Sequence, residues 1–149
     1  MAYAIGIVVG LLSALLGRVA RLDRERAFYP TILIVVAAYY ILFAAMGASR
    51  GVLVAESLGA VVFTAVAIIG FNGNLWLVAA GLAGHGVFDM FHARLVTDPG
   101  VPVWWPAFCM AADVVLGICL AVLLRSGRLP ARVPGAFLTP AGGASSPSI

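Results

Sequence analysis

Residues 75–95 read LWLVAAGLAGHGVFDMFHARL, an apolar run that is interrupted by His85, Asp89 and His92. At about 100° per residue, these three side chains lie within about 60° of one another on a helix and share one face. A run of this length can cross a bilayer, where ionisable side chains are costly and face the interior of a helix bundle. The stretch therefore predicts a membrane-spanning helix with a polar stripe turned towards its neighbours.

The composition extends this prediction to the whole chain. Of the 149 residues, 63% are hydrophobic and only 10% are charged, and the mean hydropathy is +1.10. A soluble domain contains about 25% charged residues and could not cover so much apolar surface. The basic residues are all arginines and form no long run with interleaved aromatics, so we expect no nucleic-acid partner. The main expected partner is the lipid bilayer.

Turns and charged segments divide the chain into a bundle, residues 1–125, and a tail, residues 126–149. Pro30 suits the first turn of a helix and Asn74 suits an N-cap. The tail is rich in Pro, Gly, Ala and Ser and has no apolar period, so it is predicted to be disordered and cytoplasmic. For the bundle we predict an all-α fold of five transmembrane helices at residues 1–17, 30–48, 52–70, 75–95 and 104–124.

The positions of the arginines predict the orientation in the membrane. Two of them, Arg50 and Arg94, flank one end of the predicted helices. Seven flank the other end: Arg18, Arg21, Arg24, Arg26, Arg125, Arg128 and Arg132. Arginine-rich loops stay in the cytoplasm, so we place the N-terminus outside and the C-terminus inside. The first apolar run precedes its charges, which indicates a retained helix and not a signal peptide.

This orientation brings further ionisable residues close to the polar stripe. Glu56 in the third span lies in the outer half of the membrane, and Asp113 in the fifth span lies about level with His85. Two histidines and three carboxylates are a suitable ligand set for Zn, Fe or Mn. We predict that His85, Asp89, His92 and Asp113 hold the metal. Glu56 would act as a catalytic base or as a further ligand.

Other interpretations of the same residues stay open. The metal hypothesis predicts an enzyme that acts on a lipid-soluble substrate through a site opening to the outer face. Alternatively, the carboxylates transfer protons or cations in a transporter component, or the cluster is a structural network with protonated acids. His92 lies near the outer interface and can equally be an interfacial residue. Cys109 and Cys119 are about 15 Å apart along one helix, which favours buried small hydrophobes over a disulfide.

Two features concern the packing of helices. Gly6 and Gly10 have the G-x-x-x-G spacing that allows another helix to approach closely. That helix can belong to the same bundle, to a homo-oligomer, or to a larger membrane complex in which this chain is a structural subunit. Tyr39 and Tyr40 lie in mid-span, where each hydroxyl needs a partner, so at least one is predicted to face the bundle interior.

The segment from His85 to Asp113 contains three motifs: His-x-x-x-Asp-x-x-His, then Val-Pro-Val-Trp-Trp-Pro at residues 101–106, and Cys-x-x-x-Asp. In these motifs it resembles small bacterial integral-membrane proteins of unknown function. The resemblance covers the fourth and fifth spans only. It implies a bacterial inner-membrane location and a shared polar site, and it transfers no activity.

Overall fold

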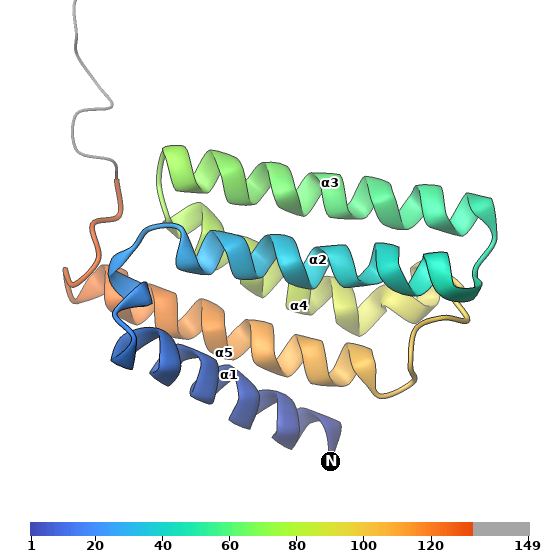
Figure 1. Cartoon of the computed structure of the whole chain (residues 1–149), viewed down its shortest axis with the longest axis horizontal. Coiled ribbons are helices and arrows are strands. Elements are labelled where there is room, and N and C mark those ends of the chain that lie inside the picture. Colours follow the sequence, from blue (N-terminus) through green and yellow to red (C-terminus); the bar gives the residue numbers. More distant parts are fainter. Residues whose placement is uncertain (133–149) are drawn as a thin grey trace, which may run out of the picture.

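The computed structural model describes residues 1–132, which fold into an up-and-down bundle of long helices joined by short turns (Figure 1). One turn of 3-10 helix, Leu22–Arg24, lies between the first two. The all-α class is confirmed, and each helix begins and ends within two residues of its predicted bounds. The helices are α1 (Ala2–Val19), α2 (Phe28–Gly47), α3 (Arg50–Asn72), α4 (Trp76–Leu95) and α5 (Trp105–Arg125).

The surface and the helix lengths are those of a multi-pass membrane protein. Four helices, α1, α2, α3 and α5, are each long and apolar enough to cross a membrane. Large apolar side chains cover the outside of the bundle, and Leu12, Leu58 and Ile118 are each more than half exposed. Such a continuous apolar surface is unfavourable in water and suits contact with lipid.

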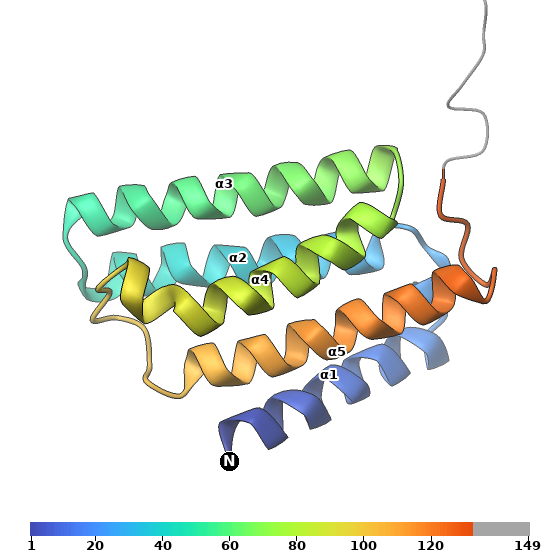
Figure 2. The same cartoon turned by 180° about the vertical axis from the view of Figure 1, so that it is seen from behind.

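α4 differs from the other helices because it contains His85, Asp89, His92 and Arg94. It packs against α2, α3 and α5 (Figures 1 and 2). Its buried face includes both histidines and the aspartate. The polar stripe is therefore turned into the bundle, as the spacing of these residues predicts.

The helix ends follow local sequence signals. The Ser49 side chain accepts a hydrogen bond from the Val52 N–H and caps α3. The Asn74 side chain accepts one from the Trp76 N–H at 3.1 Å, at the start of α4. Pro30 lies in the first turn of α2, where a missing N–H costs no helical hydrogen bond.

α1 packs against α5 at the edge of the bundle (Figure 2). A Cβ on Gly6 would lie 2.2 Å from the Phe108 carbonyl oxygen, and one on Gly10 would lie 3.0 Å from that of Ala112. The G-x-x-x-G spacing thus allows close packing within the chain. Because both glycines are buried against α5, they offer no free surface to a second copy or to another subunit in this structure.

The tail begins with an ordered segment, which differs from the predicted disorder. In residues 126–132, Leu129 is buried in the apolar core, and Arg26 donates a hydrogen bond to the Pro130 carbonyl. Burial of one leucine and pairing of backbone oxygens outweigh the polar composition here. The remainder of the predicted tail, residues 133–149, lies outside the described residues.

The bundle interior is divided along its length. An apolar cluster fills the end at which α4 begins and α5 ends; it includes Leu33, Leu75, Leu82, Leu120 and Leu129, each at most 2% exposed. The buried charged residues lie from mid-length towards the opposite end, which contains the α2–α3 and α4–α5 turns. Within residues 1–132, no buried charged side chain lies in the apolar end.

Candidate metal centre

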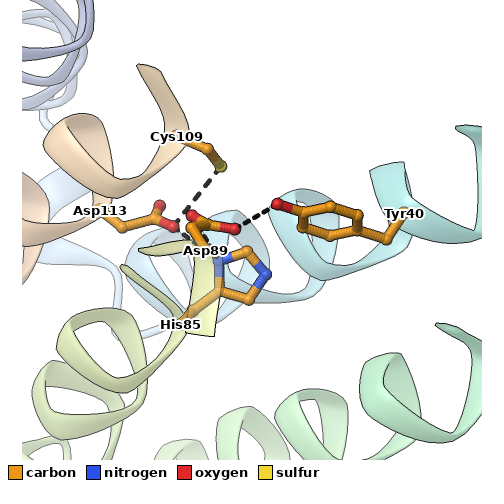
Figure 3. Close-up of polar contacts among 5 residues, drawn as sticks. All are labelled: Tyr40, His85, Asp89, Cys109 and Asp113. Carbon is orange, nitrogen blue, oxygen red and sulfur yellow. Dashed lines mark hydrogen bonds and ion pairs between the residues drawn. The ribbon is translucent and has the colours of Figure 1, made fainter. Parts of the chain in front are cut away.

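Four side chains that can bind a metal meet between α4 and α5: His85, Asp89, Cys109 and Asp113 (Figure 3). One ligand atom of each lies within 4.8 Å of those of the others, and all four residues are buried. α4 provides His85 and Asp89 with one-turn spacing, and α5 provides Cys109 and Asp113 with the same spacing. Residues four apart share a helix face, so two facing pairs build the group.

Glycines allow the two helices to approach closely beside this group. A Cβ on Gly86 would lie 3.1 Å from the Met110 carbonyl oxygen, and one on Gly117 would lie 3.2 Å from that of Ala79. Both distances are tighter than ordinary carbon contacts, so a side chain at either position would require the facing backbone to move by a few tenths of an ångström. The separation of the helices, and with it the convergence of the four donors, depends on these positions.

Hydrogen bonds link the members of the group. His85 Nδ1 is hydrogen-bonded to Asp113 Oδ2 at 2.7 Å and lies 3.5 Å from Asp89 Oδ2. The Cys109 thiol donates to the same Asp113 oxygen at 3.6 Å. In Figure 3 the thiol, both carboxylates and one ring nitrogen point towards a common centre. Asp113 therefore lies level with His85, as the sequence predicts.

Several polar atoms of the group have no partner. Within residues 1–132, His85 Nε2, Asp89 Oδ2 and Asp113 Oδ1 are buried without a hydrogen bond. A buried polar atom that is left unpaired costs about 1–3 kcal/mol. Three such atoms lie close together in this group, which is consistent with a group that could hold a metal ion.

Tyr40 of α2 completes the wall of the site. Its hydroxyl donates to Asp89 Oδ1 at 2.5 Å (Figure 3). Tyr40 is 2% exposed, whereas Tyr39 is 38% exposed. The prediction that at least one of these tyrosines faces the bundle interior is confirmed, and the hydroxyl partner is an acidic residue of the site.

The two other predicted site residues form a separate pair. His92 Nε2 lies 2.7 Å from Glu56 Oε1, in hydrogen-bond contact between α4 and α3. The His92 ring stacks on Tyr40, with ring centroids 4.2 Å apart and planes inclined by 26°. His92 is buried inside the bundle. Neither member of the pair belongs to the group of four.

The structure thus brings together three of the four predicted ligands, His85, Asp89 and Asp113, and adds Cys109 to them. Cys109 was expected to be a plain buried hydrophobe. The signal that identifies it is its position four residues before Asp113, on the same helix face. The five charged residues of the region are each at most 2% exposed, so the predicted opening to the outer face is absent from the described structure, residues 1–132.

No family model, curated protein or solved structure matches the chain. The protein is a multi-span membrane protein with a buried His/Asp/Cys group that could hold a metal ion. What this group does has to be inferred from its own chemistry.

Proposed function

We propose that this protein is a bacterial inner-membrane protein that binds a divalent transition metal inside its helix bundle, through His85, Asp89, Cys109 and Asp113. The main support is the convergence of four buried donor atoms from two helices within 4.8 Å of one another. A bound cation would also contact Asp89 Oδ2 and Asp113 Oδ1, which accept no hydrogen bond within residues 1–132. The membrane type follows from the resemblance of the α4–α5 segment to small bacterial membrane proteins.

Zinc suits this set of ligands best. Zn²⁺ binds cysteine sulfur, histidine nitrogen and carboxylate oxygen with four-fold coordination, and ligand atoms around it lie about 3.3–3.7 Å apart. The contacts of His85 Nδ1 with the two carboxylates measure 2.7 and 3.5 Å, and the contact of Cys109 with Asp113 measures 3.6 Å. All four donor atoms lie within 4.8 Å of one another, so they would have to draw slightly closer together around the ion. The thiol disfavours manganese, which prefers oxygen ligands, and leaves iron as the second choice.

A catalytic role for the metal would require a second conformation. An enzyme that acts on a lipid-soluble substrate needs access to the metal, whereas His85 and Asp113 are fully buried. Glu56 remains the candidate base, and its hydrogen bond to His92 would orient it. Metal binding is therefore the primary proposal, and catalysis by an opened form is its extension.

Metal analysis of the detergent-purified chain tests the proposal. We expect about one zinc per chain, and we expect Cys109→Ser to lower the retained zinc about tenfold or more, since a ligand is lost. The matched control is Cys119→Ser, which makes the same substitution on the same helix outside the group. A second matched pair is His85→Gln against His92→Gln, and only the first should lose metal.

Three outcomes would contradict this assignment. The parent protein could contain no stoichiometric metal even after zinc is supplied. Cys119→Ser could lose as much metal as Cys109→Ser, which would indicate general destabilisation. The His92→Gln variant could lose as much metal as the His85→Gln variant, which would restore His92 to the ligand set in place of Cys109.

A second candidate function is a component of a proton- or cation-coupled transporter. The observation that favours it is a chain of contacts across three helices, from Glu56 through His92, Tyr40 and Asp89 to His85, in which the His92–Tyr40 step is a ring stack. The apolar cluster at the other end of the bundle argues against it, because a transport route needs polar groups at both faces. Proton flux in proteoliposomes that depends on Glu56 but not on bound metal would favour transport.

A further inference from the structure

A cavity of about 600 Å³ lies at the arginine-rich end of the molecule. Figure 2 shows that α1 and α5 both end there. Its size is within the range of small-molecule sites, about 300–1,000 Å³. The residues that matter in its lining are Arg18, Arg21, Asp23, Arg24, Leu123 and Arg128. It is remote in the fold from the metal centre, and none of the four candidate ligands lines it.

The cavity has an excess of positive charge. Four arginines and a single aspartate line it, which leaves three positive charges without a counter-charge. Within residues 1–132, no ion pair engages any of these arginines. Arg26 is different, because it donates to the backbone carbonyls of Phe71 and Pro130 and stays outside the cavity. The four lining guanidinium groups are thus available to an anion, and the planar guanidinium fits a phosphate with two parallel hydrogen bonds.

Local backbone structure places these arginines. Arg21 has a left-handed conformation, with φ of 61°, which turns the chain after α1 into the 3-10 helix that contains Arg24. α5 ends in a Schellman motif: Gly127 has φ of 69°, and the Gly127 and Arg128 N–H groups donate to the Leu124 and Leu123 carbonyls. Arg128 is therefore fixed at the rim of the cavity and is not part of a loose tail.

An apolar groove continues from this cavity along the side of the bundle. It has a volume of about 290 Å³ and shares Arg18, Asp23, Leu123 and Arg128 with the cavity. From there it runs between α1 and α5. Its walls are mainly apolar and include Leu11, Leu15, Ile118, Cys119 and Val122. The two spaces together have a cationic end and an apolar groove, a combination that suits an anionic amphiphile.

We propose that this site binds an anionic glycerophospholipid, with its phosphate between Arg18, Arg24 and Arg128 and one acyl chain in the groove between α1 and α5. The arginine-rich end is the one that faces the cytoplasm under the positive-inside rule. The cytoplasmic leaflet contains anionic lipids, and basic pockets between helices on that side bind their head groups. This inference does not depend on the metal.

Native mass spectrometry of the full chain in detergent tests the lipid site. The probe is palmitoyl-oleoyl phosphatidylglycerol, compared with phosphatidylcholine of the same acyl chains. We expect one phosphatidylglycerol retained per chain and about tenfold weaker binding to the double variant Arg18→Gln/Arg128→Gln. The control Arg50→Gln/Arg94→Gln removes the same charge at the opposite end and should keep the lipid. Arg24→Gln, in a segment with no buried residue, serves as a second variant if the double variant does not fold.

The proposal is overturned if phosphatidylcholine binds as tightly as phosphatidylglycerol, because the arginines would then not select the head group. If the Arg50→Gln/Arg94→Gln control loses as much phosphatidylglycerol as the Arg18→Gln/Arg128→Gln variant, the effect is one of overall charge and not of this site. Glycerol 3-phosphate or inorganic phosphate that binds as tightly as the lipid would show an anion site to which the groove contributes nothing. Retention of lipid by the Arg24 variant and the double variant alike would likewise refute the site.

Discussion

Tyr40 connects the two halves of the buried polar region. Its hydroxyl donates to Asp89 of the candidate metal centre at 2.5 Å, and its ring stacks on His92 of the Glu56–His92 pair. An isolated carboxylate oxygen in this interior would have to be neutralised or paired. Tyr40, from α2, thus supplies a hydrogen bond to one carboxylate of the group formed by α4 and α5.

Replacing Tyr40 by phenylalanine should destabilise the protein. The substitution keeps the ring but removes the hydrogen bond to Asp89 Oδ1, and a buried acceptor without a partner costs about 1–3 kcal/mol. The measurement is thermal unfolding in detergent. The matched control is Tyr39→Phe, at a more exposed neighbour, which should stay within about 0.5 kcal/mol of the parent. Equal effects of the two substitutions would contradict the role of the hydroxyl.

Single residues also show how far the site could be predicted. The spacing of His85, Asp89 and His92 predicts a shared helix face, and all three are buried. The spacing does not tell which partner each one meets. His92 turns out to pair with Glu56, whereas His85 pairs with Asp113. Cys109 was overlooked because a cysteine in an apolar span resembles any other small apolar residue.

At the scale of helices, glycines that let two helix backbones approach closely determine the packing. Gly6 and Gly10 allow α1 to lie against α5, and Gly86 and Gly117 allow α5 to lie against α4. In lipid, helices gain little from burying apolar surface, so such close van der Waals contact is a main source of association. The arrangement of α1, α5 and α4 therefore depends on a few positions where an added Cβ would meet the facing helix at 2.2–3.2 Å.

Gly6→Ala should loosen α1. The added Cβ would lie 2.2 Å from the Phe108 carbonyl oxygen, so the helix has to shift, at a cost of about 1–3 kcal/mol. The control is Gly59→Ala in α3, where no atom lies within 4 Å of the added carbon; there we expect no loss, or a gain of about 0.5–1 kcal/mol from helix propensity. Thermal unfolding in detergent measures both. A Gly6 variant as stable as the Gly59 variant would refute the tight contact.

At the scale of the whole molecule, charge is distributed unevenly between the two ends. Seven of the nine arginines belong to the end that contains the arginine-lined cavity, and two belong to the end near the polar centre. The positive-inside rule then places the first end in the cytoplasm. Under this orientation the Glu56–His92 pair lies towards the outside, and the apolar cluster lies towards the cytoplasm.

Cysteine labelling in intact cells tests this orientation. Thr97→Cys lies in the exposed α4–α5 turn, and Ala20→Cys lies at the exposed end of α1. We expect a membrane-impermeant maleimide to label the first in intact cells and the second only after permeabilisation. The parent chain, with Cys109 and Cys119 inside α5, is the background control. The reversed pattern would contradict the arginine argument.

The sequence alone determined the helices and their class, because length and hydropathy of each segment are local properties that the bilayer environment constrains strongly. It also determined that the stripe His85–Asp89–His92 faces inwards, since a helix has a fixed angular repeat. Only the tertiary structure decided which donors meet. That depends on the rotation and height of each helix, which packing at positions such as Gly86 and Gly117 sets. This packing places Cys109 in the group with His85, Asp89 and Asp113, and it pairs His92 with Glu56.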